Sequence, residues 1–505
     1  KISQKSKFKN PKEIGPHINF KTAWCQNMLD IFSACGLDVI SRIEYSTLYP
    51  SFQIAPDYDK MIWKHYFMDY FEKCITNLST DTNSGIEYVD IRKYNSEMGL
   101  NLSPIDLETY QKIFQNLGRK PTNVEIYDIA QSQSEHARHW YFKGKINSEN
   151  KSLFQKIKSC YQPKLHQTSL ISFYDNASVV AGGLHSHFSI NLHKKYQEKV
   201  VANNFSYKAE THNFPTGISP FPGAATGVGG RIRDILCVGK GGQIIAGTAG
   251  YCVGDINFTP SSNNFKDEYG WLPSFPRKIL IEASNGASDY GNKIGEPLIQ
   301  GFTRSFRDEF KVQEVKSKHQ ELQELPSRRV EWLKPIMFSG GIGSILQSNL
   351  KKEEPRDKQL IVRVGGPAYR IGMGGGSASS RTQSQDNKKD DFQAVQRGDP
   401  LMANKLLKFM RAVLNRNINL IVSIHDQGSG GMANVTREIC EEKGATVYLD
   451  RVVCGDETLT SLEKWVAEYQ EQITMLVEPN DFRILQMIGK RENISVVAVG
   501  SVNNT

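Results

Sequence analysis

The pattern of apolar and polar positions at the start of the chain mixes short apolar runs with helical stretches. Helical patterns run through residues 22–36, 107–121 and 126–142. Gly36 stands where a helix C-terminal cap is expected, and Thr122 lies three residues before Glu125, which is the signature of a capping box. The third helix is therefore expected to begin at Thr122.

From about residue 170 the pattern changes to short apolar runs that are separated by glycine-rich turns, which predicts strands. Such runs lie at 171–174, 177–183, 187–193, 243–254 and 278–284. The charged stretch 311–335 is expected to be helical. Beyond it, strands are expected at 359–366, 420–426 and 494–502, with a helix at 401–415. The mixture of strands and helices predicts an α/β fold.

Length and composition exclude several classes of protein. A chain of 505 residues with 39% hydrophobic and 23% charged residues is expected to form about three folded domains. No stretch approaches the roughly 20 apolar residues that cross a bilayer, and no secretory signal is present, so no membrane association is expected. The net charge of +8 is too small to indicate nucleic-acid binding, but it suits a protein that binds small anions.

The eight cysteines are scattered, and no CxxC pair occurs. They predict neither a zinc ribbon nor a disulfide scaffold, so a cytoplasmic, reducing environment is expected. The chain does not begin with Met and stops just after an expected strand. We therefore expect it to be part of a longer protein.

Three segments are dense in glycine, at 220–234, 283–297 and 365–380. Backbone N–H groups of such segments can surround an anion, so each is a candidate phosphate-binding loop. The alternative is that the glycines only form tight turns. No GxxxxGK[ST] motif is present, and residues 372–377 follow GxGxxG only in part, with Ser377 in the sixth position. A P-loop enzyme and a dinucleotide-binding fold are therefore not expected.

Charged residues flank the first glycine-dense segment. Glu210 precedes it and Asp234 ends it, 24 residues later. Since Mg²⁺ takes carboxylate and phosphate oxygens, this pair could hold the metal of MgATP. His212, between them, could transfer a proton near neutral pH. The alternative is a solvated strand end with an ordinary surface histidine.

Two further groups could carry chemistry. Ser132, Glu135, His136 and His139 have the spacing of one helix face, but they lack an HExxH motif and are poor zinc ligands. The alternative is a solvated helix face. Asp426 ends an expected strand beside a glycine turn, which is a good metal position, although an Asx turn would give the same pattern.

Taken together, the motifs resemble the large, eukaryotic-type phosphoribosylformylglycinamidine synthase family. They occur in the order of that family and cover essentially the whole chain. The blocks are AQSQSEHARHWYFKGK, KAETHNFPTGISPFPGAATGVGGRIRD, GTAGYC, ASNGASDYGNKIGEP, GGPAYRIGMGGGSASS, AVQRGDP, HDQGSGG and EYQEQ.

The resemblance implies a domain organisation. Residues 1–95 would end an amino-terminal domain, 96–130 would form a helical linker, and 131–350 and 351–505 would be the nucleotide-binding and carboxy-terminal subdomains of one synthetase half. Each half is similar to aminoimidazole ribonucleotide synthetase. A second half and a glutaminase domain with its cysteine nucleophile would lie outside this chain and act as its partners.

The resemblance also implies a reaction. Enzymes of this family convert formylglycinamide ribonucleotide (FGAR), ATP and ammonia from glutamine into the amidine, ADP and phosphate. An amide oxygen is a poor leaving group, and its phosphorylation to an iminophosphate lets ammonia displace it. Mg²⁺ and backbone donors neutralise the charge on the transferred phosphoryl group.

Roles carried over from the family fall on named residues of this chain. His136 and His212 match catalytic histidines, and Glu210, Asp234 and Asp426 match magnesium ligands. The matches to ATP contacts are Lys208, Gly223, Ala224, Ala225, Thr226, Gly227, Val228, Gly229, Gly230, Arg231, Ile232, Arg233 and Asp234. The matches to substrate contacts are Thr211, Asn213, Arg233, Gln396, Glu468, Gln470 and Glu471.

Two positions depart from the family pattern. Ala137 replaces a Cys or Ser, which removes a thiol or hydroxyl beside His136, and Phe214 replaces a second histidine, as in other eukaryotic-type members. The alternatives to a ligase are a non-catalytic relative that keeps the fold as a nucleotide-binding or scaffolding protein, and a sister ATP enzyme such as aminoimidazole ribonucleotide synthetase. The charged residues of the site argue against the first, and the block around His136 argues against the second.

Overall fold

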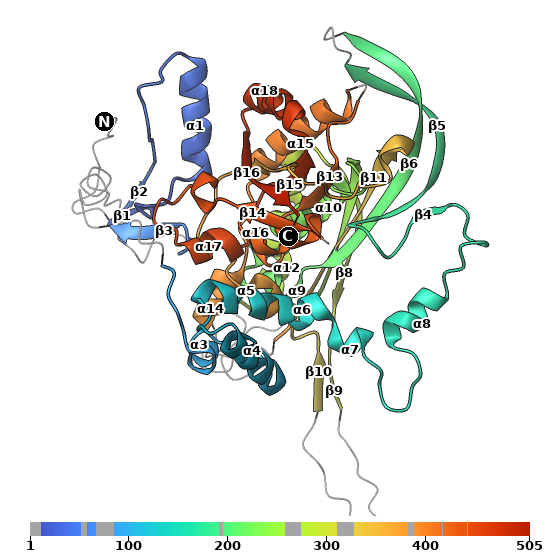
Figure 1. The fold of residues 1–505 in the computed structure, drawn as a ribbon. Helices are drawn as coiled ribbons and strands as arrows, with labels where there is room; N and C mark the ends of the chain where they lie inside the picture. The colour runs from blue at the N-terminus through green and yellow to red at the C-terminus, as the bar shows by residue number, and fades with distance from the viewer. Residues whose placement is uncertain are drawn as a thin grey trace, which may run out of the picture.

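The computed structural model describes residues 12–51, 58–66, 85–190, 195–257, 274–310, 328–381, 388–416, 418–441 and 443–504. Within them, a small amino-terminal unit and a helical linker pack against a body that contains two larger sheets (Figure 1). In the described part of the chain, no helix has the length and apolar character that crossing a membrane would need.

The amino-terminal unit is an antiparallel sheet with one helix. Its strands β1 (Lys12–Pro16), β2 (Thr47–Tyr49) and β3 (Trp63–Tyr66) lie in the order β2-β1-β3. Helix α1 (Ala23–Ala34) begins at Thr22, whose hydroxyl accepts a hydrogen bond from the Cys25 N–H over 3.0 Å. Gly36 follows the helix with a left-handed φ of 75°. The predicted helix and its glycine cap are confirmed.

The linker contains α3 (Ile91–Glu97), α4 (Pro104–Asn116) and α5 (Asn123–Gln133). Thr122 and Glu125 form the predicted capping box, with both reciprocal hydrogen bonds present. Ile126 and Ala130 of α5 join a small core with Leu462 and Val466 of α17 (Ser461–Val466). The linker is therefore fixed to the carboxy-terminal part of the body.

The larger sheet has six strands in the order β4-β5-β6-β11-β7-β8. All neighbours are antiparallel except β7 and β8, which are parallel. Helices α10 (Pro220–Leu236) and α12 (Pro276–Ile294) pack together and contact its strands β6, β7 and β11. The strands are β4 (Ser169–Ile171), β5 (Ser178–Ile190), β6 (Tyr196–Thr211), β11 (Ile336–Leu346), β7 (Gln243–Val253) and β8 (Leu298–Ser305), and β9 (Arg307–Phe310) pairs with β10 (Arg328–Glu331) in a separate hairpin.

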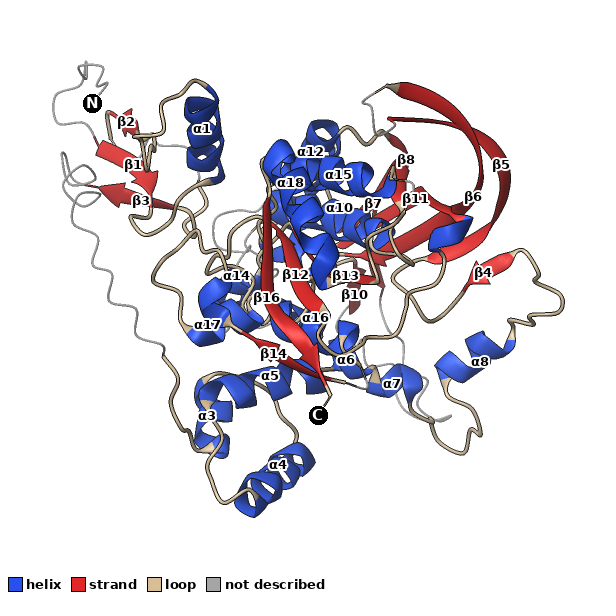
Figure 2. Cartoon of the chain, turned by 45° about the horizontal axis from the view of Figure 1, so that its top comes forward, coloured by secondary structure: helices blue, strands red, loops and turns tan. Residues whose placement is uncertain are grey.

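The second sheet is antiparallel, with the order β13-β15-β12-β16-β14. Alternate residues of β12 enter different cores: Ile361 packs with the residues of α16, and Val362 packs with those of α15 and α18. Helix α15 also contacts α12, so helices of the two sheets share one core (Figure 2). The elements are β13 (Ser423–Asp426), β15 (Gln472–Val477), β12 (Leu360–Gly365), β16 (Ser495–Asn503), β14 (Gly444–Val447), α15 (Pro400–Leu414), α16 (Gly431–Ile439) and α18 (Phe482–Glu492).

Several predicted elements differ from the structure. The apolar run 278–284 lies inside α12 and not in a strand, because a short apolar run fits a buried helix equally well. The part of 311–335 that is described contains the strand β10, not a helix. The end of the predicted strand 187–193 lies outside the described residues. The predicted strands at 359–366, 420–426 and 494–502 and the helix at 401–415 are confirmed, with small shifts at their ends.

The predicted helix over 126–142 is broken into three pieces. Helix α5 stops at Gln133, and the short helices α6 (Glu135–Arg138) and α7 (Trp140–Lys143) follow. His139 between them has a left-handed φ of 53°. The prediction that Ser132, Glu135, His136 and His139 share one helix face is therefore wrong, because the helix axis does not continue past Ser134.

The first glycine-dense segment is a buried helix, so the prediction that residues 220–234 form a loop is wrong, and the contact of this segment with ATP stays a prediction. Its glycines serve close packing. A Cβ added at Gly229 would lie 2.7 Å from the hydroxyl oxygen of Tyr290 on α12, and one at Gly227 would lie 2.9 Å from Cβ of His212. Glycine costs about 1 kcal/mol relative to alanine in a helix interior, and here it allows neighbouring elements to approach α10.

Candidate functional site

Three carboxylates from different elements gather around one lysine. Lys208 and Glu210 lie near the end of β6, Asp234 lies in α10, and Asp426 ends β13 of the other sheet. The Lys208 Nζ lies 2.8 Å from Asp234 Oδ2 and 4.0 Å from Glu210 Oε2. The structure thus brings together Lys208 and all three predicted metal ligands, in a cluster that joins both sheets.

Asn176 connects the two aspartates. Its Nδ2 donates hydrogen bonds to Asp234 Oδ1 over 2.9 Å and to Asp426 Oδ1 over 2.7 Å. Its Oδ1 accepts a hydrogen bond from Lys352 Nζ, which also pairs with Asp175 over 2.7 Å. Asp175, Asn176 and Lys352 were not among the residues predicted for the site. Their only signal was an Asp-Asn pair between two expected strands.

The pKa values in the cluster reflect burial and mutual repulsion. Burial and, after it, the charge of Asp426 raise the pKa of Asp234, Lys208 opposes both, and the net result is a pKa of about 8. Burial also raises the pKa of Glu210, against the attraction of Lys208. For Asp426, burial is outweighed by the hydrogen bond to His425 and by nearby cations, so its pKa lies below its usual range. One carboxyl of the cluster can therefore hold a proton near neutral pH.

Two histidines lie close enough for their charges to interact, and one of them, His212, is two residues beyond Glu210. His212 precedes α9 (Asn213–Ile218), and its Nε2 lies 3.3 Å from Thr226 Oγ1. Burial, together with the charges of His136 and Arg233, lowers the pKa of His212 to about 4. His136 is partly exposed to solvent, but the protein atoms packed around its ring and the neighbouring His139 lower its pKa. Both imidazoles are therefore neutral at pH 7 and able to accept a proton.

A buried glutamate is surrounded by backbone donors from two glycine turns. Glu468 Oε1 accepts hydrogen bonds from the N–H of Gly376 over 3.0 Å and of Gly430 over 3.1 Å, and Oε2 accepts one from Gln396 Nε2 over 2.7 Å. Gly376 lies in α13 (Gly375–Ser379), within the third glycine-dense segment, which was predicted to hold a phosphate. In the structure this backbone N–H binds the protein's own carboxylate.

The predicted substrate contacts around residue 470 form one buried network. Gln470 Nε2 donates to Gln396 Oε1 over 2.7 Å. Glu471 pairs with Arg233 Nη1 over 3.1 Å and accepts a hydrogen bond from the Asp399 N–H over 3.2 Å. Arg233 comes from α10 and Glu471 from the segment before β15, so this pair is a second link between the two sheets.

Some predicted site residues lie apart from this network. Arg231 is fully buried and pairs with Glu296, which leaves its guanidinium no access to a ligand. Asn213 accepts a hydrogen bond from the Met337 N–H over 3.0 Å, and Thr211 is exposed at the end of β6. The predicted ATP contacts at Gly223, Ala224, Ala225, Thr226, Gly227, Val228, Gly229 and Ile232 are all buried in α10.

The donor chemistry of the carboxylate cluster fits a hard cation such as Mg²⁺, which takes oxygen ligands. In the described part of the chain, however, no group of three or more His, Cys, Asp or Glu side chains is arranged to hold a metal ion. Lys208 lies among these carboxylates, and the charge of Arg233 also acts on them.

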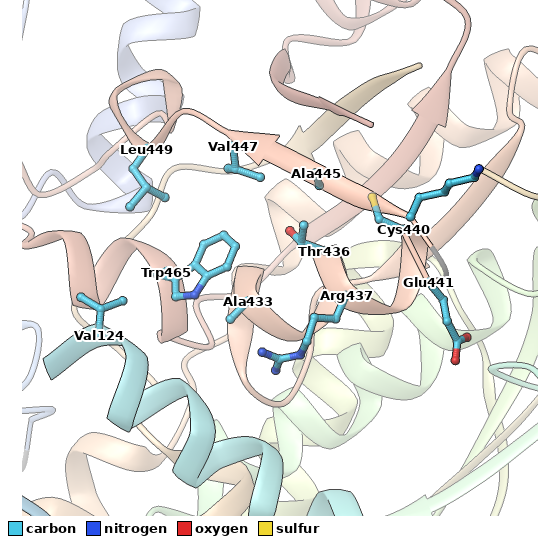
Figure 3. A pocket seen from close by; sticks show the side chains of 11 residues that line it. Val124, Ala433, Thr436, Arg437, Cys440, Glu441, Ala445, Val447, Leu449 and Trp465 are labelled. Carbon is cyan, nitrogen blue, oxygen red and sulfur yellow. The ribbon is translucent and has the colours of Figure 1, made fainter. Parts of the chain in front are cut away.

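Two cavities are relevant to ligand binding. One of about 670 Å³ adjoins the cluster, and Asp175, Lys352, His425 and Glu438 are among the residues that line it. Another of about 520 Å³ lies between α5, α16, α17 and β14 (Figure 3). It is lined mainly by apolar side chains such as Trp465 and contains none of the predicted site residues. No predicted site residue lines the first cavity either, but Lys352 and His425 in its wall contact Asn176 and Asp426 of the cluster, so this cavity is the one next to the candidate site.

Comparison with known families matches two parts of the chain. Residues 91–139 match the formylglycinamide ribonucleotide amidotransferase linker domain, and residues 357–505 match the AIR synthase related protein, C-terminal domain. In solved structures, Thermotoga maritima PurL complexed with FGAR matches 78% of this chain and 52% of that chain, with a TM-score of 0.53 and 21% identity. PurL complexed with ADP gives a TM-score of 0.51. These likenesses show the fold, which is the mixed α/β fold predicted above.

Similar full-length proteins are much longer than this chain. A probable phosphoribosylformylglycinamidine synthase, chloroplastic/mitochondrial, of Arabidopsis thaliana is 43% identical over 97% of this chain and 36% of that protein. The phosphoribosylformylglycinamidine synthases of Dictyostelium discoideum and Homo sapiens are 42% and 39% identical over 97% of this chain, and 37% and 38% of their own lengths are covered. The chain therefore spans little more than a third of the length of these relatives.

Proposed function

Because this chain is a homologue of the phosphoribosylformylglycinamidine synthases along almost its whole length, we propose that it supplies one catalytic half of an ATP-dependent carbon–nitrogen ligase of purine biosynthesis. The substrates would be FGAR, ATP and ammonia derived from glutamine. The observation that carries the proposal is the cluster of Lys208, Glu210, Asp234 and Asp426, which joins both sheets beside two neutral histidines.

The chemistry needs two displacements. The amide oxygen of FGAR attacks the γ-phosphorus of ATP, and ADP leaves. Ammonia then attacks the activated carbon, its surplus proton passes to a base, and the C–O bond breaks to release phosphate. His212 or His136 suits the base, because both have lowered pKa values and are neutral at pH 7.

ATP would approach through the cavity of about 670 Å³, since Lys351 and Lys352 line it beside Asp175. Glu210, Asp234 and Asp426 would hold Mg²⁺ once their side chains turn from Lys208 and Asn176 toward the ion, which when bound neutralises charge on the phosphates. Glu468, with Gln396, would contact FGAR on the side of the second sheet. A second synthetase half and a glutaminase domain would be the partners of this chain.

The test uses the complete protein that contains this chain. Phosphate release is followed with MgATP, FGAR and saturating ammonium, which bypasses the glutaminase. We expect His136→Ala and Asp234→Asn each to lower FGAR-dependent release by about a hundredfold or more. Asp289→Asn, at an exposed ion pair on α12, is the matched control and should not change it.

Failure of the proposal would be clear. If the folded wild type binds nucleotide but shows no FGAR-dependent release, the protein is not this ligase and is better described as a nucleotide-binding relative. If release persists in both variants, the chemistry is located elsewhere in the protein.

A further inference from the structure

A buried ion pair connects the amino-terminal unit to the candidate site. Arg397 Nε lies 2.8 Å from Asp59 Oδ2, and Arg397 Nη2 lies 3.3 Å from Asp59 Oδ1. The two side chains are 6% and 19% exposed, respectively. This two-point geometry orients a guanidinium as well as neutralising it.

Both partners are held in place locally. The Asp59 Oδ1 accepts a hydrogen bond from the Met61 N–H over 2.9 Å, so Asp59 is fixed within its own turn before β3. Arg397 Nη1 donates to the carbonyl oxygens of Phe392, over 2.8 Å, and Val395, and the guanidinium lies over the Phe392 ring. Arg397 therefore connects three parts of the molecule: α14 (Lys388–Ala394), the segment that follows it, and the amino-terminal unit.

The residues on either side of Arg397 point into the buried network. Gln396 donates to Glu468, and the Asp399 N–H donates to Glu471. Within segment 395–399, Arg397 thus contacts Asp59, whereas Gln396 and Asp399 contact the proposed substrate-binding residues. A shift of Arg397 would be passed on to Gln396 through a single peptide bond.

We infer that Asp59 is a positioning residue for the candidate site: by fixing Arg397 it sets the position of Gln396 and, through Gln396, of Glu468. This inference rests on the proposed function where it concerns FGAR, and on contacts alone where it concerns segment 395–399. The amino-terminal unit is then part of the substrate-binding machinery, although no residue described in it lines the carboxylate cluster.

A second ion pair between the same two parts of the molecule provides the control. Lys405 on α15 pairs with Asp30 on α1. It joins the amino-terminal unit to the body, and in the described part of the chain none of its hydrogen bonds reaches segment 395–399. Lys405 acts on that segment only through the attraction of its charge for Asp399. Asp30→Asn weakens docking of the unit in general, whereas Asp59→Asn removes the charge that holds Arg397.

The first experiment is hydrogen–deuterium exchange on the complete protein, without substrate. We expect Asp59→Asn to speed exchange of the peptide that covers residues 393–399 by at least about fivefold, because a buried arginine without its partner is strongly disfavoured. Asp59→Glu should restore slow exchange, and Asp30→Asn should leave this peptide unchanged. Equal exchange in the wild type and Asp59→Asn, or an equal increase in Asp59→Asn and Asp30→Asn, would overturn the inference.

The second experiment separates binding from turnover. With ammonium as donor, we expect Asp59→Asn to raise the KM for FGAR by about tenfold, which is about 1.4 kcal/mol, while the KM for ATP stays constant. Arg397→Lys, which keeps the charge but loses the two-point contact, should act in the same direction. An unchanged KM for FGAR in an active Asp59→Asn variant would refute the role in substrate binding. If the wild type does not use FGAR at all, the proposed function fails, but the exchange result still decides whether Asp59 positions the segment.

Discussion

Glu468 shows how a buried acid can remain titratable near neutral pH. Burial raises its pKa to about 7, although two backbone N–H groups and Gln396 donate hydrogen bonds to it. The donors favour the carboxylate, but they do not replace all of the water that it loses. The charge of Glu468, which is one of the proposed substrate contacts, therefore changes within the physiological pH range.

This shift predicts a pH dependence of stability. The folded pKa of about 7 lies above the unfolded value of about 4.3, so between these values the folded state binds more protons than the unfolded state. The free energy of unfolding should fall as pH rises from below about 4.3 to above about 7, by about 4 kcal/mol from this group alone. Glu468→Gln removes the ionisation and should flatten that part of the profile. Urea unfolding of both proteins between pH 5 and 8 measures it, and parallel profiles would contradict the assignment.

The residues of the site were predictable where charge and spacing carried information. Glu210, Asp234 and Asp426 were predicted from charge and position, Lys208 was predicted from the family resemblance, and the structure brings the four together. Asn176 was missed because an amide has no charge and no motif of its own. Its importance comes only from its position, which places one Nδ2 between two aspartates that lie far apart in the sequence.

At the scale of elements, the glycines of α10 predict an unusual response to substitution. Gly→Ala in a helix interior usually stabilises by up to about 1 kcal/mol. At Gly229, however, the new Cβ would lie 2.7 Å from the Tyr290 hydroxyl oxygen and 2.8 Å from its ring carbon Cζ. Since overpacking costs about 1–3 kcal/mol, we expect Gly229→Ala to lower the free energy of unfolding. Urea denaturation at constant pH measures the difference.

The control for this prediction is Gly291, in the last turns of α12. A Cβ there would have its nearest neighbours, the Glu296 carbonyl oxygen and the Leu298 side chain, at 3.3 Å, so these atoms need to move by only a few tenths of an ångström. Gly291→Ala should therefore be neutral or slightly stabilising. If Gly229→Ala were as stable as Gly291→Ala, the glycines of α10 would not be explained by close packing.

The same helix shows where prediction of elements from sequence fails. Periodic apolar patterns and capping residues predicted α1, the start of α5 and α15, because these signals are local. Glycine content predicted a loop at 220–234, whereas the structure has a helix there. The glycines are needed because Tyr290 and His212 approach this helix from other elements, and such contacts leave no signal in the local sequence. Likewise, the end of α5 at Gln133 has no proline or glycine to announce it. The domain boundaries given for the sequence stay predictions.

At the scale of the whole molecule, a long hairpin stands out from the body. The outer parts of β5 and β6 extend beyond the rest of the six-stranded sheet (Figure 1). In this antiparallel register, Leu184 is opposite Ala202, and Phe188 is opposite Glu198. Leu184, Phe188, Tyr196 and Val200 therefore share one face, and they are 76%, 68%, 72% and 70% exposed. Such an apolar face is typical of a protein–protein contact.

We expect the second synthetase half, the proposed partner of this chain, to cover this face in the complete protein. The face therefore predicts that the isolated chain associates with itself. We expect the average mass in sedimentation velocity to rise above the 56.9 kDa of one chain as concentration increases. Phe188→Lys with Val200→Lys places two charges on the face and should keep the chain monomeric. Val201→Lys with His185→Lys adds two charges to the opposite face of the same hairpin and should leave association unchanged, since these residues are opposite each other in the register. If the unmodified chain stays monomeric at all concentrations, the exposed face does not need a partner, and the proposed second half must contact another surface.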